Sequence, residues 1–381
     1  MGIALIIPVF ASVVIALAYL SWSAWLIKGL KNVVSVPVGD KGAGTCKVSV
    51  VIAARNEEKN IGTCLISIVR MGLPGNAEII VVDDHSEDAT AGTVRAFIQK
   101  CPQIKLVELP EGKSGKKEAI TGGIDKAGGE LILLTDADCI VPENWIEDIT
   151  NFYSKDKPAM IIMPVLMNTG RNFFEKLQAL EFFSLVAVTA SAAAQARPVM
   201  CNGAALAYRK DVFKDLKGYS GNLHFPSGDD MMLMQEIKRD GKYSVAWFYN
   251  GTACVQTPAQ PGLRKFFDQR TRWASKTKHY SDKRTTALAL FVFLASVMPL
   301  LLCAEAIVMH LGSLLSLAFY FFIFKTGIDL LFLLLAAKIF KTSLNFALFF
   351  TAAVLYPFYI LTVGFASVFV PVKWKGRKYH A

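Results

Sequence analysis

Histidine is scarce in this sequence, and its cysteines form no pattern. The 5 histidines among 381 residues are scattered, so no zinc site is indicated. The 7 cysteines are odd in number and lack paired spacing, and several stand in apolar surroundings. These features favour reduced structural thiols over a disulfide framework.

Motifs that would assign other functions are also missing. No Gly-x-Ser-x-Gly sequence occurs, which disfavours a hydrolase with a nucleophile elbow. Gly112-Lys113-Ser114 looks like part of a P-loop, but that motif needs a glycine where Val107 stands. No motif for reading nucleic acid accompanies the net charge of +10, so nucleic acid is not an expected partner.

Long apolar runs are present at both ends of the chain. Residues 3–27 carry no charge and are followed at once by Lys28 and Lys31, which indicates an uncleaved anchor whose C-terminal end faces the cytoplasm. Three more apolar stretches lie near residues 287–311, 313–337 and 344–371. The basic run 264–284 and the basic tail flank them, so membrane lipids are an expected partner.

The last three stretches raise a question of topology. Three full crossings from a cytoplasmic domain would place the basic tail outside, against the positive-inside tendency. Either one stretch is re-entrant or interfacial, or the tail is external. Lys325 and Asp329 stand one helical turn apart in the middle stretch and are expected to pair.

The region between the apolar runs begins with alternating strand and helix patterns. Buried strands are indicated at 48–53, 78–82, 104–107 and 131–134, with helical spacing of apolar residues between them. This order predicts an α/β fold with a mainly parallel sheet and helices on both faces. Residues 172–195 predict a long helix that is either part of the core or interfacial.

Acidic pairs follow two of these strands, at the edge where parallel sheets bind ligands. Asp136 and Asp138 can hold Mg²⁺ or Mn²⁺, which prefer oxygen ligands, although a solvated turn explains the pair alone equally well. Asp83 and Asp84 can accept hydrogen bonds from a nucleobase or ribose, and capping of the next helix is the alternative.

Three further elements carry chemistry. Lys116 offers a point charge for a diphosphate, and a solvated basic loop is the alternative. Asp229 and Asp230 begin a helix, which suits a general base or a simple cap. In Gln269-Arg270-Thr271-Arg272-Trp273, the second arginine can clamp a diphosphate and the tryptophan can face a sugar ring; a tryptophan beside a membrane span is the alternative.

The order of these elements resembles family-2 glycosyltransferases of the GT-A (Rossmann-like) fold, of the integral-membrane type with a Gln-x-x-Arg-Trp motif. The resemblance covers about residues 47–280. Val51–Glu58 looks like the opening strand and nucleotide-contacting turn, and Asn202-Gly203-Ala204 like the acceptor-side turn. Lys116 fits the Gly-Lys-x-x-Ala-Leu-Asn stretch, from which Ile120 and Thr121 depart.

The resemblance implies a role for each matching residue. Asp230 would be the catalytic base of an inverting hexosyl transfer, with Asp229 competing because Gly228 and Asp229 depart from the family pattern. Asp136 and Asp138 would hold Mg²⁺ or Mn²⁺. The implied donor-binding residues are Ala54, Asn56, Glu57, Asp83, Asp84, Lys116, Asp136 and Arg272. The implied acceptor-binding residues are Asn202, Gly203, Gln269 and Trp273.

The expected function is sugar transfer from a nucleotide-diphosphate donor, most commonly UDP in this family, to a membrane-associated acceptor. We favour a lipid acceptor because few apolar segments are present to build a polymer channel. The alternatives are a processive polysaccharide synthase coupled to export and a catalytically silent, nucleotide-binding membrane scaffold.

These patterns predict an integral protein of the cytoplasmic (inner) membrane whose catalytic domain faces the cytoplasm. The predicted parts are an N-terminal transmembrane anchor at 1–31, a linker at 32–46, a catalytic domain with interfacial helices at 47–285, a transmembrane region of two to three helices at 286–372 and a basic tail at 373–381.

Overall fold

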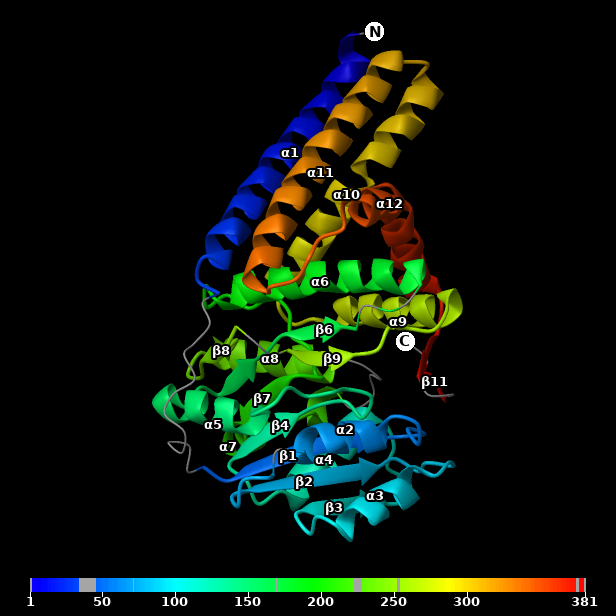
Figure 1. The fold of residues 1–381 in the computed structure, drawn as a ribbon. Coiled ribbons are helices and arrows are strands. Elements are labelled where there is room, and N and C mark those ends of the chain that lie inside the picture. The colour runs from blue at the N-terminus through cyan, green and yellow to red at the C-terminus, as the bar shows by residue number, and fades with distance from the viewer. Residues whose placement is uncertain are drawn as a thin grey trace. The chain divides into compact units, whose positions relative to one another are not determined.

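In the computed structural model the chain divides into two compact units, coloured along the chain in Figure 1. The helical unit comprises Met1–Asn32 and Gly262–Val370, and the sheet unit comprises Val33–Pro261 and Pro371–Ala381. The structure describes residues 2–33, 46–70, 72–168, 170, 172–222, 228–251, 254–374 and 377–379. Most of the predicted linker 32–46 and part of the predicted tail 373–381 lie outside the described residues, and the predicted domain limits stay predictions.

The helical unit contains four helices that are long and apolar enough to cross a membrane. These are α1 (Gly2–Leu30), α10 (Lys283–Met309), α11 (Gly312–Ile339) and α12 (Phe346–Phe369). They confirm the apolar runs that the sequence indicated at both ends. Two further helices, α9 (Leu263–Ser275) and the short 3-10 helix η2 (Lys276–His279), directly precede α10 in the chain.

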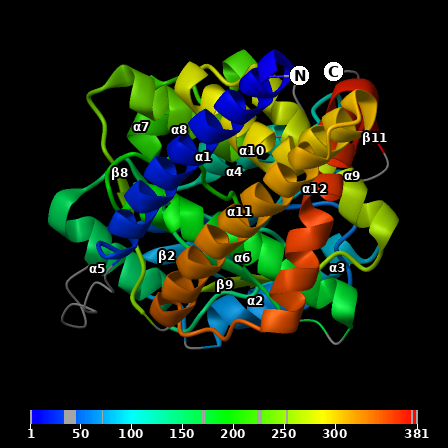
Figure 2. The same cartoon turned by 90° about the horizontal axis from the view of Figure 1, so that it is seen from above.

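Polar groups join α1 to α11, which lie side by side in Figures 1 and 2. Lys325 Nζ lies 2.7 Å from Asp329 Oδ2, which confirms the expected pair. Tyr19 on α1 donates its hydroxyl to Asp329 Oδ1 at 2.5 Å. A charge inside an apolar helix is costly, so this closed arrangement of partners stabilises the contact between the two helices.

The sheet unit is built on a seven-stranded sheet of order β3-β2-β1-β4-β7-β5-β8. The strands are β1 (Val48–Ala54), β2 (Ala77–Asp83), β3 (Ile104–Glu108), β4 (Leu131–Leu134), β5 (Met160–Ile162), β7 (Leu206–Arg209) and β8 (Val245–Trp247). The first four are parallel to one another, β7 is antiparallel to both its neighbours, and β5 pairs parallel with β8. The predicted mainly parallel sheet is confirmed.

Smaller strands and the helices complete this unit. Two strands, β6 (Val165–Met167) and β9 (Val255–Thr257), pair in parallel, and β10 (Val372–Trp374) with β11 (Arg377–Tyr379) forms an antiparallel hairpin. The helices are α2 (Ile61–Val69), α3 (Thr90–Ile98), α4 (Lys116–Lys126), α5 (Trp145–Asp156), α6 (Phe173–Ala193), α7 (Lys210–Asp215), the 3-10 turn η1 (Ser220–Asn222) and α8 (Asp229–Asp240).

The packing of α4 on β1 positions the site described below. Val50, Val51 and Ile52 of β1 are buried, as a strand covered on both faces requires. A Cβ added at Gly123 would lie 2.5 Å from Val51 Cγ1, so only glycine permits α4 to approach this closely. The close approach fixes the first turn of α4, which carries Lys116, relative to the strand ends.

Candidate functional site

The predicted acidic residues lie at the carboxyl ends of neighbouring strands. Asp83 is the last residue of β2 and pairs in register with Ala54 at the end of β1. Asp136 and Asp138 follow β4, which pairs with the other side of β1. Because β1, β2 and β4 are parallel, all these residues emerge at one edge of the sheet.

Hydrogen bonds connect the turn that follows β1 with the turn that follows β2. Asn56 has a positive φ of 52° and accepts the backbone N–H of Glu87 at 2.9 Å through Oδ1. The backbone N–H of Asn56 donates to Ser86 Oγ at 3.0 Å, and that of Glu57 donates to Thr90 Oγ1 at 2.8 Å. Asn56 therefore has a structural role in these turns, and the donor-binding roles of Ala54, Asn56 and Glu57 stay predictions.

The two aspartates after β2 face different surroundings. Asp84 Oδ2 accepts the backbone N–H of Gly115 at 3.0 Å, which ties the end of β2 to the start of α4. Asp83 is 7% exposed, and its Oδ2 accepts the N–H of Ser86 at 3.1 Å. Its Oδ1 is buried without a hydrogen-bond partner among the described residues. Since an unpaired buried oxygen is costly, Asp83 Oδ1 is suited to accept a hydrogen bond from a ligand.

Lys116 joins two of the predicted carboxylate motifs. Its Nζ lies 2.6 Å from Asp136 Oδ1 and 3.7 Å from Asp229 Oδ2. Burial lowers the pKa of the Lys116 ammonium, but the charges of Asp136 and Asp229 outweigh burial, so the net effect is a raised pKa. The lysine is therefore charged at neutral pH. It contacts both Asp136 and Asp229, although Asp229 lies 113 positions after Lys116 in the chain.

The pair after β4 fits a hard divalent cation. Asp136, Asp138 and Cys139 offer ligand atoms that all lie within 4.8 Å of one another. Burial strongly raises the pKa of the Cys139 thiol, and its Sγ lies 3.6 Å from Asp138 Oδ1 as a weak donor. The protonated thiol is thus a poor ligand, whereas two partly exposed carboxylates match the oxygen preference of Mg²⁺ or Mn²⁺.

The first turn of α8 brings the two candidate bases to the same place. Asp230 accepts the backbone N–H of Gly203 at 3.1 Å and of Met231 at 2.7 Å. A Cβ added at Gly203 would lie 3.3 Å from both Asp229 Oδ2 and Lys116 Nζ. The predicted acceptor-side turn therefore packs directly on the two candidate general bases, Asp229 and Asp230, and on Lys116, the residue predicted to bind the diphosphate.

Within that turn, Asn202 folds back on its own backbone. Its Oδ1 accepts the N–H of Ala204 at 3.0 Å. Asp229 Oδ2 is buried and forms no hydrogen bond to a described residue, although it faces Lys116. The sheet unit thus brings together Lys116, Asp136, Asp229, Asp230 and Gly203.

The remaining predicted residues lie on α9, in the helical unit. Arg270 is buried there, with its guanidinium 4.2 Å from the ring centre of Trp273 and 4.8 Å from that of Phe266. Arg270 also donates to Gln269 Oε1 at 2.6 Å. The expected roles of Gln269, Arg272 and Trp273 stay predictions.

Sequence reasoning missed three side chains around these motifs. Arg55 donates to the carbonyl oxygens of Asp84 and His85 at 2.7 Å each, which holds the turn after β2. Cys64 Sγ lies 3.6 Å from the carbonyl oxygen of Asp136, behind the metal motif. Arg270 contacts Gln269 and Trp273 and stands between them in the motif. Its position inside the motif was the sequence signal that could have identified it.

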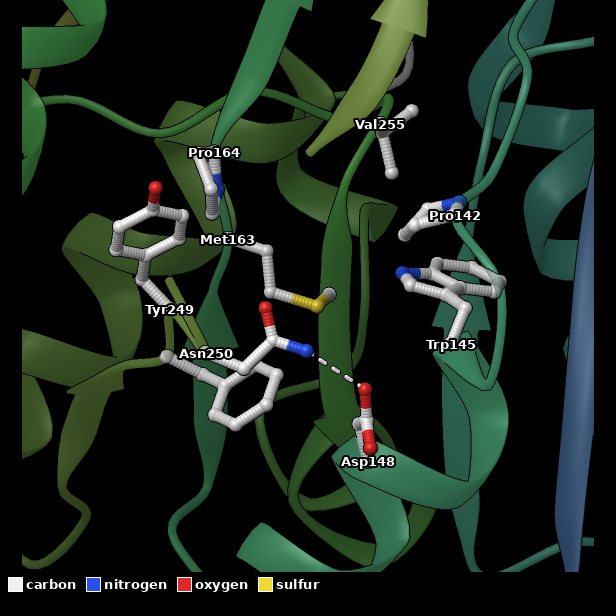
Figure 3. Close-up of a pocket in the computed structure, with 9 residues that line it drawn as sticks. Pro142, Trp145, Asp148, Met163, Pro164, Tyr249, Asn250 and Val255 are labelled. Atoms are coloured by element: carbon white, nitrogen blue, oxygen red, sulfur yellow. Dashed lines mark hydrogen bonds between the residues drawn. The ribbon is translucent and has the colours of Figure 1, made fainter. Parts of the chain in front are cut away.

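A separate pocket lies between α5 and the strands β5, β6 and β9 (Figure 3). It is lined by Pro142, Trp145, Asp148, Met163, Pro164, Phe248, Tyr249, Asn250 and Val255. Asn250 Nδ2 donates to Asp148 Oδ2 at 2.7 Å, the dashed line in Figure 3, and burial raises the pKa of the Asp148 carboxyl. None of the predicted site residues lines this pocket.

Comparison with known proteins finds a protein family that matches part of the sheet unit. Residues 49–217 match the family model "Glycosyl transferase family 2". A beta-monoglucosyldiacylglycerol synthase from Synechocystis is 27% identical over 45% of this chain and 40% of its own length. An N-acetylglucosaminyltransferase from Rhizobium meliloti is 29% identical over 70% of this chain and 62% of its own length. The chain thus matches less than two thirds of the length of either relative.

A solved structure agrees on the fold. The mannosyltransferase PcManGT from Pyrobaculum calidifontis, in complex with GDP-Man and Mn²⁺, superposes with a TM-score of 0.58 at 16% identity, over 94% of this chain and 98% of the other. The predicted GT-A-like fold is confirmed. Over residues 49–217, less than half of the chain, the sequence is similar to glycosyl transferase family 2.

Proposed function

We propose that this protein is a membrane-bound glycosyltransferase that moves a sugar from a nucleotide-diphosphate donor to an acceptor hydroxyl with inversion at the anomeric carbon. The observation that carries the proposal is Lys116, whose ammonium joins Asp136 of the metal motif to Asp229 of α8. This arrangement gathers a cation, a metal-binding pair and a base candidate where a diphosphate leaving group and an acceptor hydroxyl could meet.

Asp230 is the proposed general base. Two backbone N–H groups hold its carboxylate at the start of α8, where the helix dipole favours the ionised form. A carboxylate fixed in this way can remove the proton from an acceptor hydroxyl as that oxygen attacks the anomeric carbon. Gly203, whose backbone N–H donates to Asp230, carries no side chain of its own beside this carboxylate.

On the donor side, Asp136 and Asp138 would hold Mg²⁺ or Mn²⁺. Such an ion neutralises charge on the leaving diphosphate. Lys116 would add positive charge to the same group. Asp83 Oδ1, which has no hydrogen-bond partner among the described residues, would accept a hydrogen bond from the nucleoside, most commonly uridine in this family. The complex of PcManGT with GDP-Man and Mn²⁺ supports this class of donor and a divalent ion.

The acceptor is proposed to be a lipid, in keeping with the glucosyldiacylglycerol synthase among the relatives. The N-acetylglucosaminyltransferase relative favours polysaccharide synthesis as the second candidate. The basic residues that flank the apolar helices support a location in the cytoplasmic membrane, with the sheet unit facing the cytoplasm.

The test is a transfer assay with the full chain in lipid nanodiscs. The protein is incubated with a panel of nucleotide sugars, Mg²⁺ or Mn²⁺ and a lipid extract, and nucleoside diphosphate release and product partition are measured. We expect the unmodified protein to release nucleoside diphosphate and to form a product that partitions into the organic phase. Asp138→Ala should abolish this release while the variant still inserts into the membrane. Asp240→Asn, at the exposed end of α8, is the matched control and should remain active. A polymeric product would favour the second candidate, and no release with any donor would refute sugar transfer.

A further inference from the structure

The C-terminal end of α12 lies beside the beginning of α10. Lys278 Nζ, five residues before α10, donates to the carbonyl oxygen of Val368 at 3.5 Å. A Cβ added at Gly364 would lie 2.9 Å from the ring of Phe293, which belongs to the first half of α10. The last turns of α12 are therefore placed at the end of the helical unit where α10 starts.

The beginning of α12 is tied to the same end. His310 and Leu311 alone separate α10 from α11, and the two helices pack against each other as a hairpin (Figure 1). The hairpin returns the chain to the side on which α10 began. Residues 340–345 then lead to α12, and six residues reach at most about 20 Å, less than the roughly 30 Å of a bilayer core.

The residues after α12 provide an independent observation. Pro371–Ala381 belong to the same compact unit as Val33–Pro261, which follow α1 and precede α10. A compact unit outside the bilayer occupies one side of it. The chain after α12 must then lie on the side reached after α1.

We propose that α12 does not carry the chain across the membrane. Its outward face instead lies among the acyl chains of one leaflet, the leaflet on the side of the membrane where α10 begins. Crossings by α1, α10 and α11 alone put Lys278, Lys338 and Lys341 on one side together with the tail. The turn between α10 and α11 carries no lysine or arginine. Every basic cluster then obeys the positive-inside tendency, and the topology question raised by the sequence is resolved.

The two faces of α12 fit this placement. Phe349, Pro357 and Val363 are buried within the helical unit. A stripe of apolar side chains on the same helix is 47–67% exposed at positions spaced three or four apart: Phe350, Val354, Phe358, Leu361, Phe365 and Phe369. The basic residues Lys338 and Lys341 just before this helix complement anionic headgroups, so we assign the stripe to phospholipid rather than to a protein partner.

Reporter fusions to the complete chain test the topology. Green fluorescent protein and alkaline phosphatase are each fused after Ala381, so that no helix is removed. We expect fluorescence and at least tenfold lower phosphatase activity per molecule than a secreted phosphatase control. An active phosphatase with a dark fluorescent fusion would overturn the proposal, because it would place the tail outside.

Photocrosslinking tests the occupant of the exposed stripe. Benzoylphenylalanine replaces Phe358 or, as the matched buried control, Phe349, which is 4% exposed. In membranes containing phosphatidylglycerol, the Phe358 site should label phospholipid and the Phe349 site should crosslink within the chain. Crosslinking of Phe358 to another protein, or equal lipid labelling at both sites, would contradict the assignment.

Discussion

Two lysine–aspartate pairs among the described residues have nearly equal length but differ in what surrounds them. In the helical unit, Lys325 and Asp329 are 2.7 Å apart on one helix. In the sheet unit, Lys116 and Asp136 are 2.6 Å apart and come from two different parts of the chain. Distance alone does not separate them.

The difference lies in the unused hydrogen-bonding capacity. The Lys325 pair is closed, because Asp329 also accepts from Tyr19 and the ammonium lies 5.0 Å from the centre of the Tyr19 ring. In the sheet unit, by contrast, Asp229 Oδ2, 3.7 Å from Lys116 Nζ, is buried without a hydrogen bond to a described residue, and so is Asp83 Oδ1 at the end of β2. A closed pair stabilises a helix contact, whereas a pair beside unpaired acceptors is arranged to receive a ligand.

The largest expected effect is that of Asp230→Asn on the open cluster. The amide keeps the size of the side chain but cannot take a proton, so the transfer rate should fall about 10²- to 10⁴-fold, as for loss of a general base. Single-turnover kinetics at saturating donor measure this. Asp229→Asn is the informative companion: if its loss equals or exceeds that of Asp230→Asn, the base assignment passes to Asp229.

Breaking the closed pair should change stability and leave chemistry intact. Lys325→Met strands the Asp329 charge in an apolar helix and should cost about 3 kcal/mol of stability. Thermal unfolding in nanodiscs reports this loss, while kcat per folded molecule should stay unchanged. The double variant Lys325→Met with Asp329→Leu should recover most of the loss; a large fall in kcat would show that this pair takes part in function.

Lys116→Met should separate metal binding from donor binding. Removal of an ammonium 2.6 Å from a metal ligand should tighten Mn²⁺ binding about tenfold without nucleotide, since a charged hydrogen bond contributes roughly 1.5 kcal/mol. Donor affinity should weaken in the same variant. Calorimetric titrations with Mn²⁺ and then with nucleoside diphosphate test both effects, and Lys126→Met at the exposed end of α4 is the control. Unchanged Mn²⁺ affinity would remove Lys116 from the metal site.

Tyr19→Phe should have the smallest effect. It removes one hydrogen bond between α1 and α11, and such bonds in membrane helices contribute about 0.6 kcal/mol on average. A small drop in melting temperature with normal transfer activity is expected. A drop as large as that of Lys325→Met would mean that the hydroxyl, rather than the ammonium, stabilises Asp329.

The parts that the sequence predicted have strong local signals. The buried strands β1, β2 and β4 are apolar runs, β2 ends in Asp83, and Asp136 follows two residues after β4. Helix α2 buries Ile61, Cys64, Leu65 and Ile68 at the expected spacing. Lys325 and Asp329 are one turn apart, so their pairing needed no tertiary information.

The parts that it did not predict depend on long-range contacts. Strands β5, β7 and β8 have only three or four residues each, too few for a periodic pattern, and the antiparallel β7 is defined by its neighbours. The contact of Lys116 with both Asp136 and Asp229 arises from the packing of Gly123 on Val51 and of Gly203 on α8. The support that Arg270 gives to Trp273 likewise requires knowledge of side-chain directions.

The most direct measurement is a structure of the full chain in nanodiscs with Mn²⁺ and a nucleoside diphosphate. We expect an ion held between Asp136 and Asp138, a diphosphate within hydrogen-bond distance of Lys116 and a nucleoside that donates to Asp83 Oδ1. An ion away from these carboxylates, or the nucleotide in the pocket of Figure 3, would contradict it.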